Sequence, residues 1–192
     1  LIPDKSIDLV LTDPPYGINI DTTYNKFKNA KSYEPICGDM DVFEFSILWR
    51  LSSKFIIWGG NCFAQSLPSF PGWLAWIKTG RNGARIRQAE MELAWTNFIT
   101  RSQCFRFTWI GAYREGDAQL TLHPTMKPTQ LMDWCLQLVP EANLILDPFL
   151  GSGTTAYCAK KLNRKCIGIE IEEKYCEIAA KRCSQLVMKL EV

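Results

Sequence analysis

The stretch 143–155, NLILDPFLGSGTT, constrains the fold of this chain more than any other. It begins as an apolar run of strand length, turns at two glycines and continues into a helical pattern that extends to about residue 162. A further strand is expected over 165–171 (KCIGIEI) and a closing helix over 172–190. Strand, helix, strand and helix at this spacing predict parallel βαβ units. We therefore predict an α/β fold with a doubly wound, mostly parallel sheet.

The preceding residues add strands that fit the same sheet. Buried strands are predicted over 7–12 and 54–61, the second ended by Gly59 and Gly60, with a short helix over 43–51 between them. The apolar runs 72–78 and 91–97 flank a basic loop and predict an antiparallel edge pair. Alternation over 104–113 predicts another strand, and the apolar stripe over 129–139 predicts a helix. Residues 17–41 are polar and lysine-rich and predict a long loop.

Length and composition narrow the class of protein. A chain of 192 residues is enough for one domain with a substantial core, so we expect a single domain over 1–192. No apolar run approaches the roughly 20 residues of a membrane helix, and no signal-peptide pattern opens the chain. The eight cysteines are scattered and only one histidine is present, so we expect buried free thiols and no metal site. A cytoplasmic protein with no membrane partner is expected.

Positive charge is concentrated in one part of the chain. Residues 78–114 hold seven basic side chains against two acidic ones, although the whole chain carries a net charge of only +2. Such a strip is typical of a surface that meets a polyanion, and solvated loop arginines are the alternative. We predict that four residues of this strip contact the phosphates of such a polyanion: Lys78, Arg81, Arg85 and Arg87.

The segment TDPPYG, residues 12–17, follows the first predicted strand. Pro14 and Pro15 have fixed φ angles and no N–H, so the Pro14 carbonyl is not needed by a strand partner. That carbonyl and the Asp13 carboxylate can both accept hydrogen bonds from one amino group, and Tyr16 offers a ring for stacking on a base. Two such acceptors would stabilise the transition state for attack by an aromatic amine. The alternative is a rigid turn.

The glycine turn points to a second ligand. Gly151 and Gly153 let a ligand approach the backbone, and Glu170 ends the next predicted strand, where an acid can accept hydrogen bonds from ribose hydroxyls. An ordinary strand–helix turn and a helix N-terminal charge are the alternatives. Together with Asp147, these residues favour a cofactor that carries adenosine and needs no phosphate grip.

DPPY together with DPFLGSGTT resembles the amino-methyltransferases of DNA, which transfer a methyl group from S-adenosylmethionine to N6 of adenine or N4 of cytosine. DPPY precedes the glycine motif, as in the permuted β-type members, and HPTMKP (residues 123–128) is a further family motif. The segments IIWGGNCF and ELAWTN are similar to short phage and prophage adenine methyltransferases. The resemblance covers nearly the whole chain and implies a permuted, Rossmann-like methyltransferase fold.

The resemblance implies roles for individual residues. The target base would be held by Asp13, Pro14, Pro15 and Tyr16. The HPTMKP residues would lie near the methionine end of the cofactor, where a lysine can pair with its carboxylate. The full predicted cofactor set is Asp13, His123, Thr125, Lys127, Asp147, Phe149, Gly151, Ser152, Gly153, Thr154 and Glu170.

The resemblance also leaves alternatives. Asp13 favours adenine, because the family prefers Ser before Pro-Pro-Tyr for cytosine, and cytosine N4 is the nearest rival. An RNA base, a protein glutamine and a truncated inactive DNA-binding module are further rivals. The chain starts inside the segment that follows a family strand near the cofactor's adenine, so whether that strand is missing stays open, and the 192 residues by themselves are expected to bind the cofactor weakly. The short stretch 98–122 is the predicted target-recognition insertion. We expect a prokaryotic or phage-infected host cell and leave a homodimer and a restriction partner open.

Overall fold

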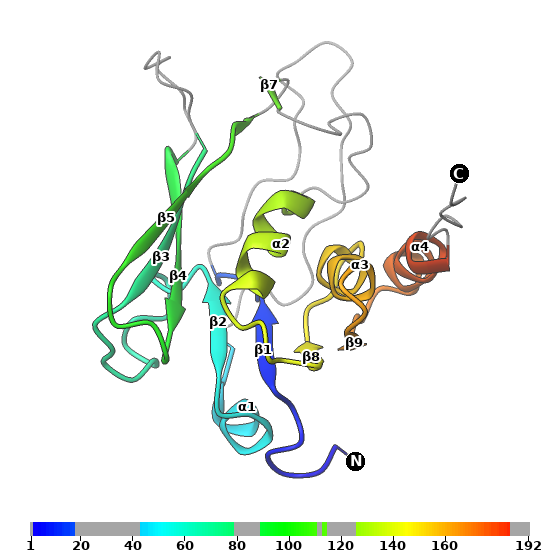
Figure 1. Ribbon diagram of the computed structural model, residues 1–192, viewed down its shortest axis with the longest axis horizontal. Helices are drawn as coiled ribbons and strands as arrows, with labels where there is room; N and C mark the ends of the chain where they lie inside the picture. The colour runs from blue at the N-terminus through cyan, green and yellow to red at the C-terminus, as the bar shows by residue number, and fades with distance from the viewer. Residues whose placement is uncertain (1, 18–42, 79–88, 111–112, 115–125, 185–192) are drawn as a thin grey trace.

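The computed structural model describes residues 2–17, 43–78, 89–110, 113–114 and 126–184. The predicted loop over 17–41 lies almost wholly outside these residues. The described chain alternates strands and helices, as Figure 1 shows. The elements are β1 (Leu9–Thr12), α1 (Ser46–Leu51), β2 (Phe55–Trp58), β3 (Trp73–Ile77), β4 (Met91–Thr96), β5 (Gln103–Arg106), β6 (Trp109–Ile110), β7 (Tyr113–Arg114), α2 (Thr129–Gln137), β8 (Leu144–Asp147), α3 (Thr154–Lys161), β9 (Lys165–Gly168) and α4 (Glu173–Ser184).

Seven of the described strands form one sheet in the order β5-β3-β4-β2-β1-β8-β9. The pairs β2–β1, β1–β8 and β8–β9 are parallel, whereas β4 runs antiparallel to both β2 and β3. The predicted α/β class with a mostly parallel sheet and an antiparallel pair is therefore confirmed. The pair does not form the edge, however, because β5 adds to β3 in parallel.

The strands in the middle of the sheet are buried on both faces. Every residue of β1 and β2 is buried, and successive side chains alternate between two cores. Leu9 and Leu11 face the core that α2 and α3 cover, whereas Val10 faces the core that contains α1. Figure 1 shows α2 and α3 in front of the sheet and α1 near its lower end. This burial explains why the sequence of these strands is apolar except at Thr12, the last residue of β1.

Three predicted elements differ from the observed ones. The strand predicted over 104–113 is interrupted: β5 ends at Arg106, and β6 and β7 form a separate antiparallel pair. The chain still follows β3 beyond β5, because the Phe107 and Trp109 amides donate to carbonyls of Ile77 and Lys78. The other two differences concern element ends. The helix predicted over 43–51 begins only at Ser46, and the strand predicted over 165–171 ends at Gly168.

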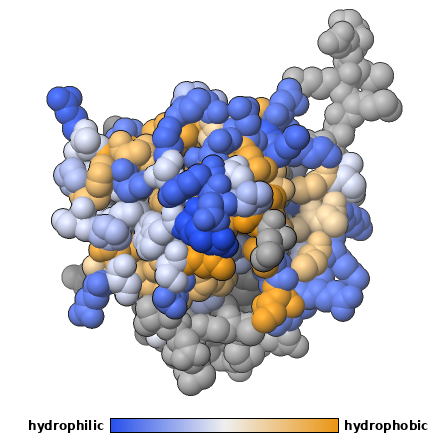
Figure 2. Space-filling model, turned by 90° about the horizontal axis from the view of Figure 1, so that it is seen from below, coloured by the Kyte–Doolittle hydropathy of each residue, from blue (hydrophilic) through white to orange (hydrophobic). Residues whose placement is uncertain are grey.

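The surface view from below Figure 1 shows hydrophilic side chains spread over this face, with smaller apolar areas between them (Figure 2). Within the described residues, no helix has the length and apolar character needed to cross a membrane. The expectation that the cysteines are buried is only partly right. Cys135 and Cys158 are buried, whereas Cys62, Cys104 and Cys176 are exposed. Cys37 lies outside the described residues.

Candidate active site

The carboxyl ends of β1 and β8 bring the two sequence motifs side by side. These strands are parallel neighbours, so the segment after Thr12 and the segment after Asp147 leave the sheet at the same edge. The Thr12 hydroxyl donates a hydrogen bond of 2.9 Å to Asp147 Oδ1, which joins the two strand ends directly. In open α/β sheets, ligands bind at this edge. The structure thus places DPPY next to the glycine turn, although 135 positions separate Thr12 from Asp147.

The Asp13 carboxylate accepts hydrogen bonds on both of its oxygens. Oδ1 accepts from the Tyr16 hydroxyl at 2.7 Å, and Oδ2 accepts from Lys127 Nζ at 2.5 Å. Pro14 is buried and Pro15 is half-buried, and neither can donate a backbone hydrogen bond that would continue β1. Each carboxylate oxygen offers about two lone pairs. Asp13 is therefore held in one orientation and can still accept from an incoming amino group.

The Tyr16 ring is fixed at both ends. Its hydroxyl is bonded to Asp13, and its edge packs against Phe63 with ring centroids 6.2 Å apart. The ring lies directly over Gly59, whose φ is +70°, and a Cβ on that glycine would come within 2.1 Å of the Tyr16 ring. Burial raises the pKa of the Tyr16 hydroxyl, and the Asp13 charge raises it further. The hydroxyl therefore remains a donor to Asp13 at neutral pH.

Lys127, which precedes α2, contacts two carboxylates. Its Nζ lies 2.5 Å from Asp13 Oδ2 and 3.1 Å from Glu92 Oε2, and only 8% of its side chain is exposed. Burial by itself would lower the pKa of Lys127, but the neighbouring charges of Asp13 and Glu92 raise it well above its ordinary value. The sequence placed Lys127 at a cofactor carboxylate, which stays a prediction. The structure places its ammonium between two carboxylates of the protein.

Glu92 was missed by the sequence analysis as a site residue. It lies at the start of β4, and because β4 is antiparallel to β2, this start falls at the same edge as the carboxyl ends of the parallel strands. Its Oε1 accepts from Lys78 Nζ at 2.6 Å. Burial would raise the pKa of Glu92, but Lys127 and Lys78 outweigh burial and lower it to about 2. The signal that could have identified it is an acidic residue inside an otherwise apolar strand pattern, as in MELAW (residues 91–95).

The glycine turn between β8 and α3 is built on two residues with positive φ. Gly151 has φ +52°, and Gly153 has φ +82° and lies so close to α4 that a Cβ would meet Ala179 at 2.7 Å. Ser152 and Thr154 are buried, and Arg182 donates to the Ser152 carbonyl and the Thr154 hydroxyl. The structure therefore gives the Thr154 hydroxyl a protein partner, and its predicted cofactor contact stays a prediction.

Asp147 is enclosed at the end of β8. Its side chain accepts from the Thr12 hydroxyl and from the Phe149 amide, and 3% of the residue is exposed. Burial raises its pKa to about 6, although hydrogen bonds from Thr155, Thr12 and Phe149 act in the opposite direction. This environment gives Asp147 a structural task at the junction of β1 and β8. A direct contact of its carboxylate with a cofactor stays a prediction.

Glu170 lies two residues beyond the end of β9 and closes over the glycine turn. Its Oε2 accepts from the Gly151 amide at 2.7 Å, and its Oε1 accepts from the Glu172 amide at 2.9 Å. The two flanking isoleucines are exposed, with 51% of Ile169 and 77% of Ile171 accessible to solvent. A half-buried carboxylate between exposed apolar side chains suits a ligand with hydroxyl groups beside an apolar ring. Phe149 is half-buried at the same turn and packs edge-on against Phe43.

The predicted DNA contacts are described only in part. Lys78 follows β3, and its ammonium pairs with Glu92 and lies 5.3 Å from the centre of the Trp76 ring. Its predicted phosphate contact is untested. Five other predicted site residues lie outside the described part of the chain: Arg81, Arg85, Arg87, His123 and Thr125. Among the described residues, no group of three or more His, Cys, Asp or Glu side chains could hold a metal ion.

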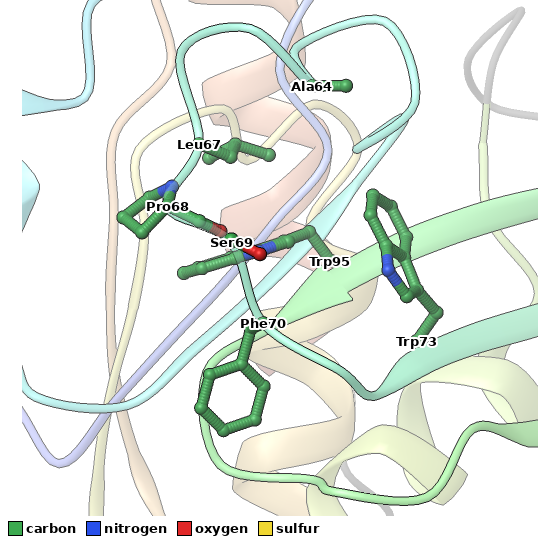
Figure 3. Close-up of a pocket in the computed structure, with 7 residues that line it drawn as sticks. All are labelled: Ala64, Leu67, Pro68, Ser69, Phe70, Trp73 and Trp95. Atoms are coloured by element: carbon green, nitrogen blue, oxygen red, sulfur yellow. The ribbon is translucent and has the colours of Figure 1, made fainter.

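A cavity of about 260 Å³ lies away from these residues (Figure 3). Trp73 and Trp95 line one part of it, and the segment from Ala64 to Phe70 lines the rest. Trp73 of β3 pairs with Trp95 of β4, and Trp95 pairs in turn with Ile57 of β2, so the cavity lies beside this part of the sheet. None of the described residues that line it has an ionisable side chain. The chemistry of this protein is therefore not expected there.

Comparison with known proteins agrees with the resemblance to DNA methyltransferases and with the fold, and the β-type subtype stays a prediction. A family profile described as DNA methylase matches residues 72–181. The chain is 25% identical over 242 aligned residues to the type II methyltransferase M.HinfI of Haemophilus influenzae, covering 96% of this chain but only 65% of that protein.

Solved structures share the fold. The PvuII DNA methyltransferase, described as cytosine-N4-specific, matches with a TM-score of 0.61 and 16% identity, covering 100% of this chain and 83% of that one. The M1.HpyAVI–SAM complex matches with a TM-score of 0.53 and 23% identity, covering 93% of this chain and 90% of that one.

Proposed function

The chain belongs to the DNA methylase family, and on this premise we propose that it transfers a methyl group from S-adenosylmethionine to N6 of an adenine in DNA. The observation that carries the proposal is the adjacency of two sites at one sheet edge. Asp13, with its two fixed hydrogen bonds, stands beside the glycine turn that Glu170 closes. One site is suited to an aromatic amine, and the other to an adenosine-bearing molecule.

The residues at the glycine turn fit the cofactor. Glu170 is already oriented by the Gly151 and Glu172 amides, and its remaining lone pairs can accept from the two ribose hydroxyls. Exposed Ile169 and Ile171 offer an apolar surface to an adenine ring beside that carboxylate. The relative solved as a SAM complex supports the choice of cofactor. When bound, S-adenosylmethionine would supply an electrophilic methyl group, whose bond to sulfur breaks as the bond to nitrogen forms, with S-adenosylhomocysteine as the leaving group.

The protein contributes orientation and charge rather than a nucleophile. The Asp13 carboxylate and the Pro14 carbonyl accept hydrogen bonds from the adenine amino group and direct its nitrogen towards the methyl group. Positive charge develops on that nitrogen during transfer, and the negative charge of Asp13 stabilises it more than it stabilises the neutral amine. The Tyr16 ring, held by Asp13 and Phe63, offers a surface for stacking on the base. The proton then leaves to Asp13 or to water.

The target base must leave the DNA duplex to reach Asp13, which costs a few kcal/mol of unstacking. The basic strip around Arg85 and Arg87 offers contacts to phosphates that can offset this cost. Residues 98–122 remain the proposed target-recognition segment of a single domain. Their described part includes β5 at the edge of the sheet.

The proposal is tested with tritiated S-adenosylmethionine and unmethylated DNA, followed by digestion to nucleosides. Label in N6-methyl-2′-deoxyadenosine is expected. Label in N4-methyl-2′-deoxycytidine would transfer the proposal to cytosine, and absence of label would refute it. Asp13→Ala should reduce the rate by on the order of 10²–10³, the usual effect of losing one preorganised transition-state contact. Asp4→Ala is the matched control, because Asp4 is an exposed partner of Arg50.

A further inference from the structure

Four charged side chains form a continuous, mostly buried ion-pair network at the carboxyl ends of the parallel strands, next to the candidate active site. It runs from Lys78 to Glu92, then to Lys127, and ends at Asp13. The N–O distances are 2.6 Å for Lys78–Glu92, 3.1 Å for Glu92–Lys127 and 2.5 Å for Lys127–Asp13. None of the four side chains is more than 21% exposed. The two positive and two negative charges balance, so this network of four side chains has no net charge.

Burying four charges needs a reason beyond stability. Desolvation offsets much of the attraction in a buried ion pair, and well-packed apolar residues often stabilise a protein as well. The neighbours of Glu92 in the sheet belong to the core: Trp76 of β3 pairs with Glu92, and Ala94 lies two residues further along β4. An ion network at this place therefore suggests a function at the one member that meets the substrate, Asp13.

We propose that Glu92 is a positioning residue for methyl transfer, which fixes Lys127 against Asp13 and offsets the charge of Lys127. The proposal rests on the function proposed above and adds a residue of β4 to its machinery. Glu92 touches neither base nor cofactor in this scheme. It acts through Lys127, whose ammonium it shares with Asp13.

The need for Glu92 follows from the charge that develops during the reaction. Lys127 orients Asp13, but its positive charge opposes the positive charge that grows on the amine nitrogen. Electrostatic effects of this kind are strong in a site shielded from water. The negative charge of Glu92, 3.1 Å from Lys127 Nζ, offsets the positive charge of Lys127. Asp13 can then stabilise the positive charge of the transition state. Burial would raise the pKa of Glu92, but Lys127 and Lys78 hold it near 2, so Glu92 stays charged at neutral pH.

The test compares Glu92→Gln with Glu90→Gln in the whole chain. Glu90 lies two residues earlier and is exposed, so its replacement also removes one negative charge, but from an exposed position rather than from the buried network. Glu92→Gln should lower kcat by on the order of tenfold to a hundredfold, somewhat less than the loss of a direct contact. The KM values for DNA and for S-adenosylmethionine should both stay within about threefold, because neither ligand touches Glu92. A loss that appears in KM alone would refute a role in positioning Asp13.

A double-mutant cycle separates this role from simple stabilisation. If Glu92 acts through Lys127, then in a Lys127→Met background the further change Glu92→Gln should alter kcat by less than about threefold. Equal effects of Glu92→Gln in both backgrounds would overturn the proposal. Circular dichroism at the assay temperature verifies that each variant is folded.

A readout without catalysis distinguishes failure of this inference from failure of the proposed function. The ¹⁵Nζ signal of Lys127, assigned with Lys127→Met, should shift and broaden in Glu92→Gln and stay in place in Glu90→Gln. Among the described residues, the charged or titratable groups that face Lys127 are Asp13, Glu92 and Tyr16, so loss of Glu92 removes one of the two carboxylates that the structure places beside it. A parent that methylates no base would refute the proposed function. An unchanged Lys127 signal in Glu92→Gln would refute the coupling, whether or not the parent is active.

Discussion

Gly59→Ala is expected to disturb the candidate active site without changing any residue that touches a ligand. Gly59 follows β2, with φ +70°, and the Tyr16 ring lies directly over it. A Cβ at this position would come within 2.1 Å of Tyr16 Cε1 and 2.5 Å of Cδ1. Both distances are far below van der Waals contact, so either the backbone or the ring must move. The ring cannot move far without breaking its hydrogen bond to Asp13.

Two physical effects determine how much the free energy of unfolding falls in Gly59→Ala. The left-handed backbone conformation costs an alanine roughly 1–2 kcal/mol. Overpacking against the ring adds about 1–3 kcal/mol. If the ring instead swings away, the lost hydrogen bond to a charged group costs about 1.5–3 kcal/mol, so the second effect is similar in either case. We therefore expect the free energy of unfolding to fall by about 2–5 kcal/mol in total.

The measurement is urea unfolding followed by circular dichroism, together with the methyl-transfer assay. Gly59→Ala should unfold at lower urea and transfer methyl groups much more slowly than the parent. The matched comparison is the same change in a Tyr16→Ala background, where the contact with the ring is absent and only about 1–2 kcal/mol of backbone strain should remain. An equal cost of Gly59→Ala in both backgrounds would show that the Tyr16 ring does not lie over Gly59.

Three further predictions concern other parts of the site. Burial raises the pKa of Asp147 from 3.8 to about 6, so the parent should lose on the order of 3 kcal/mol of stability as pH rises through that window. In urea titrations, Asp147→Asn should flatten this pH dependence of stability. A pH dependence that persists in the variant would assign it to another group. Glu170→Ala should weaken S-adenosylmethionine binding at least about tenfold by calorimetry, the value of one good hydrogen bond, whereas the exposed control Glu177→Ala should not; unchanged affinity would leave Glu170 as a clamp on the glycine turn. Replacing Arg85 and Arg87 with alanine should weaken binding to every DNA sequence and flatten the plot of log affinity against log salt by nearly two units; a variant that loses only one sequence would exclude phosphate contacts.

Local patterns in the sequence were enough to predict most of the elements. β1, β2 and β8 are largely buried on both faces, so their sequences are nearly continuous apolar runs that are easy to recognise. The glycine turn was also visible, because Gly151 and Gly153 adopt backbone angles that other residues rarely adopt. The pattern was less informative beyond Arg106, where β5 ends although apolar residues continue to alternate. There the hydrogen bonds to the end of β3, which are contacts distant in sequence, decide where the strand stops.

The candidate site separates the two kinds of information in the same way. Asp13, Tyr16 and Glu170 could be selected from the sequence because each lies at or just after the end of a predicted strand, and the chemistry of a strand end depends on a few neighbouring residues. The pairing of Lys127 with Asp13 could not be predicted, because 114 positions separate them, and neither could the role of Glu92, which contacts Lys127 from another strand. Only the antiparallel course of β4 brings Glu92 to the edge where the parallel strands end. Sequence therefore determined the groups that can do the chemistry, and the order and direction of the strands decided which charges surround them.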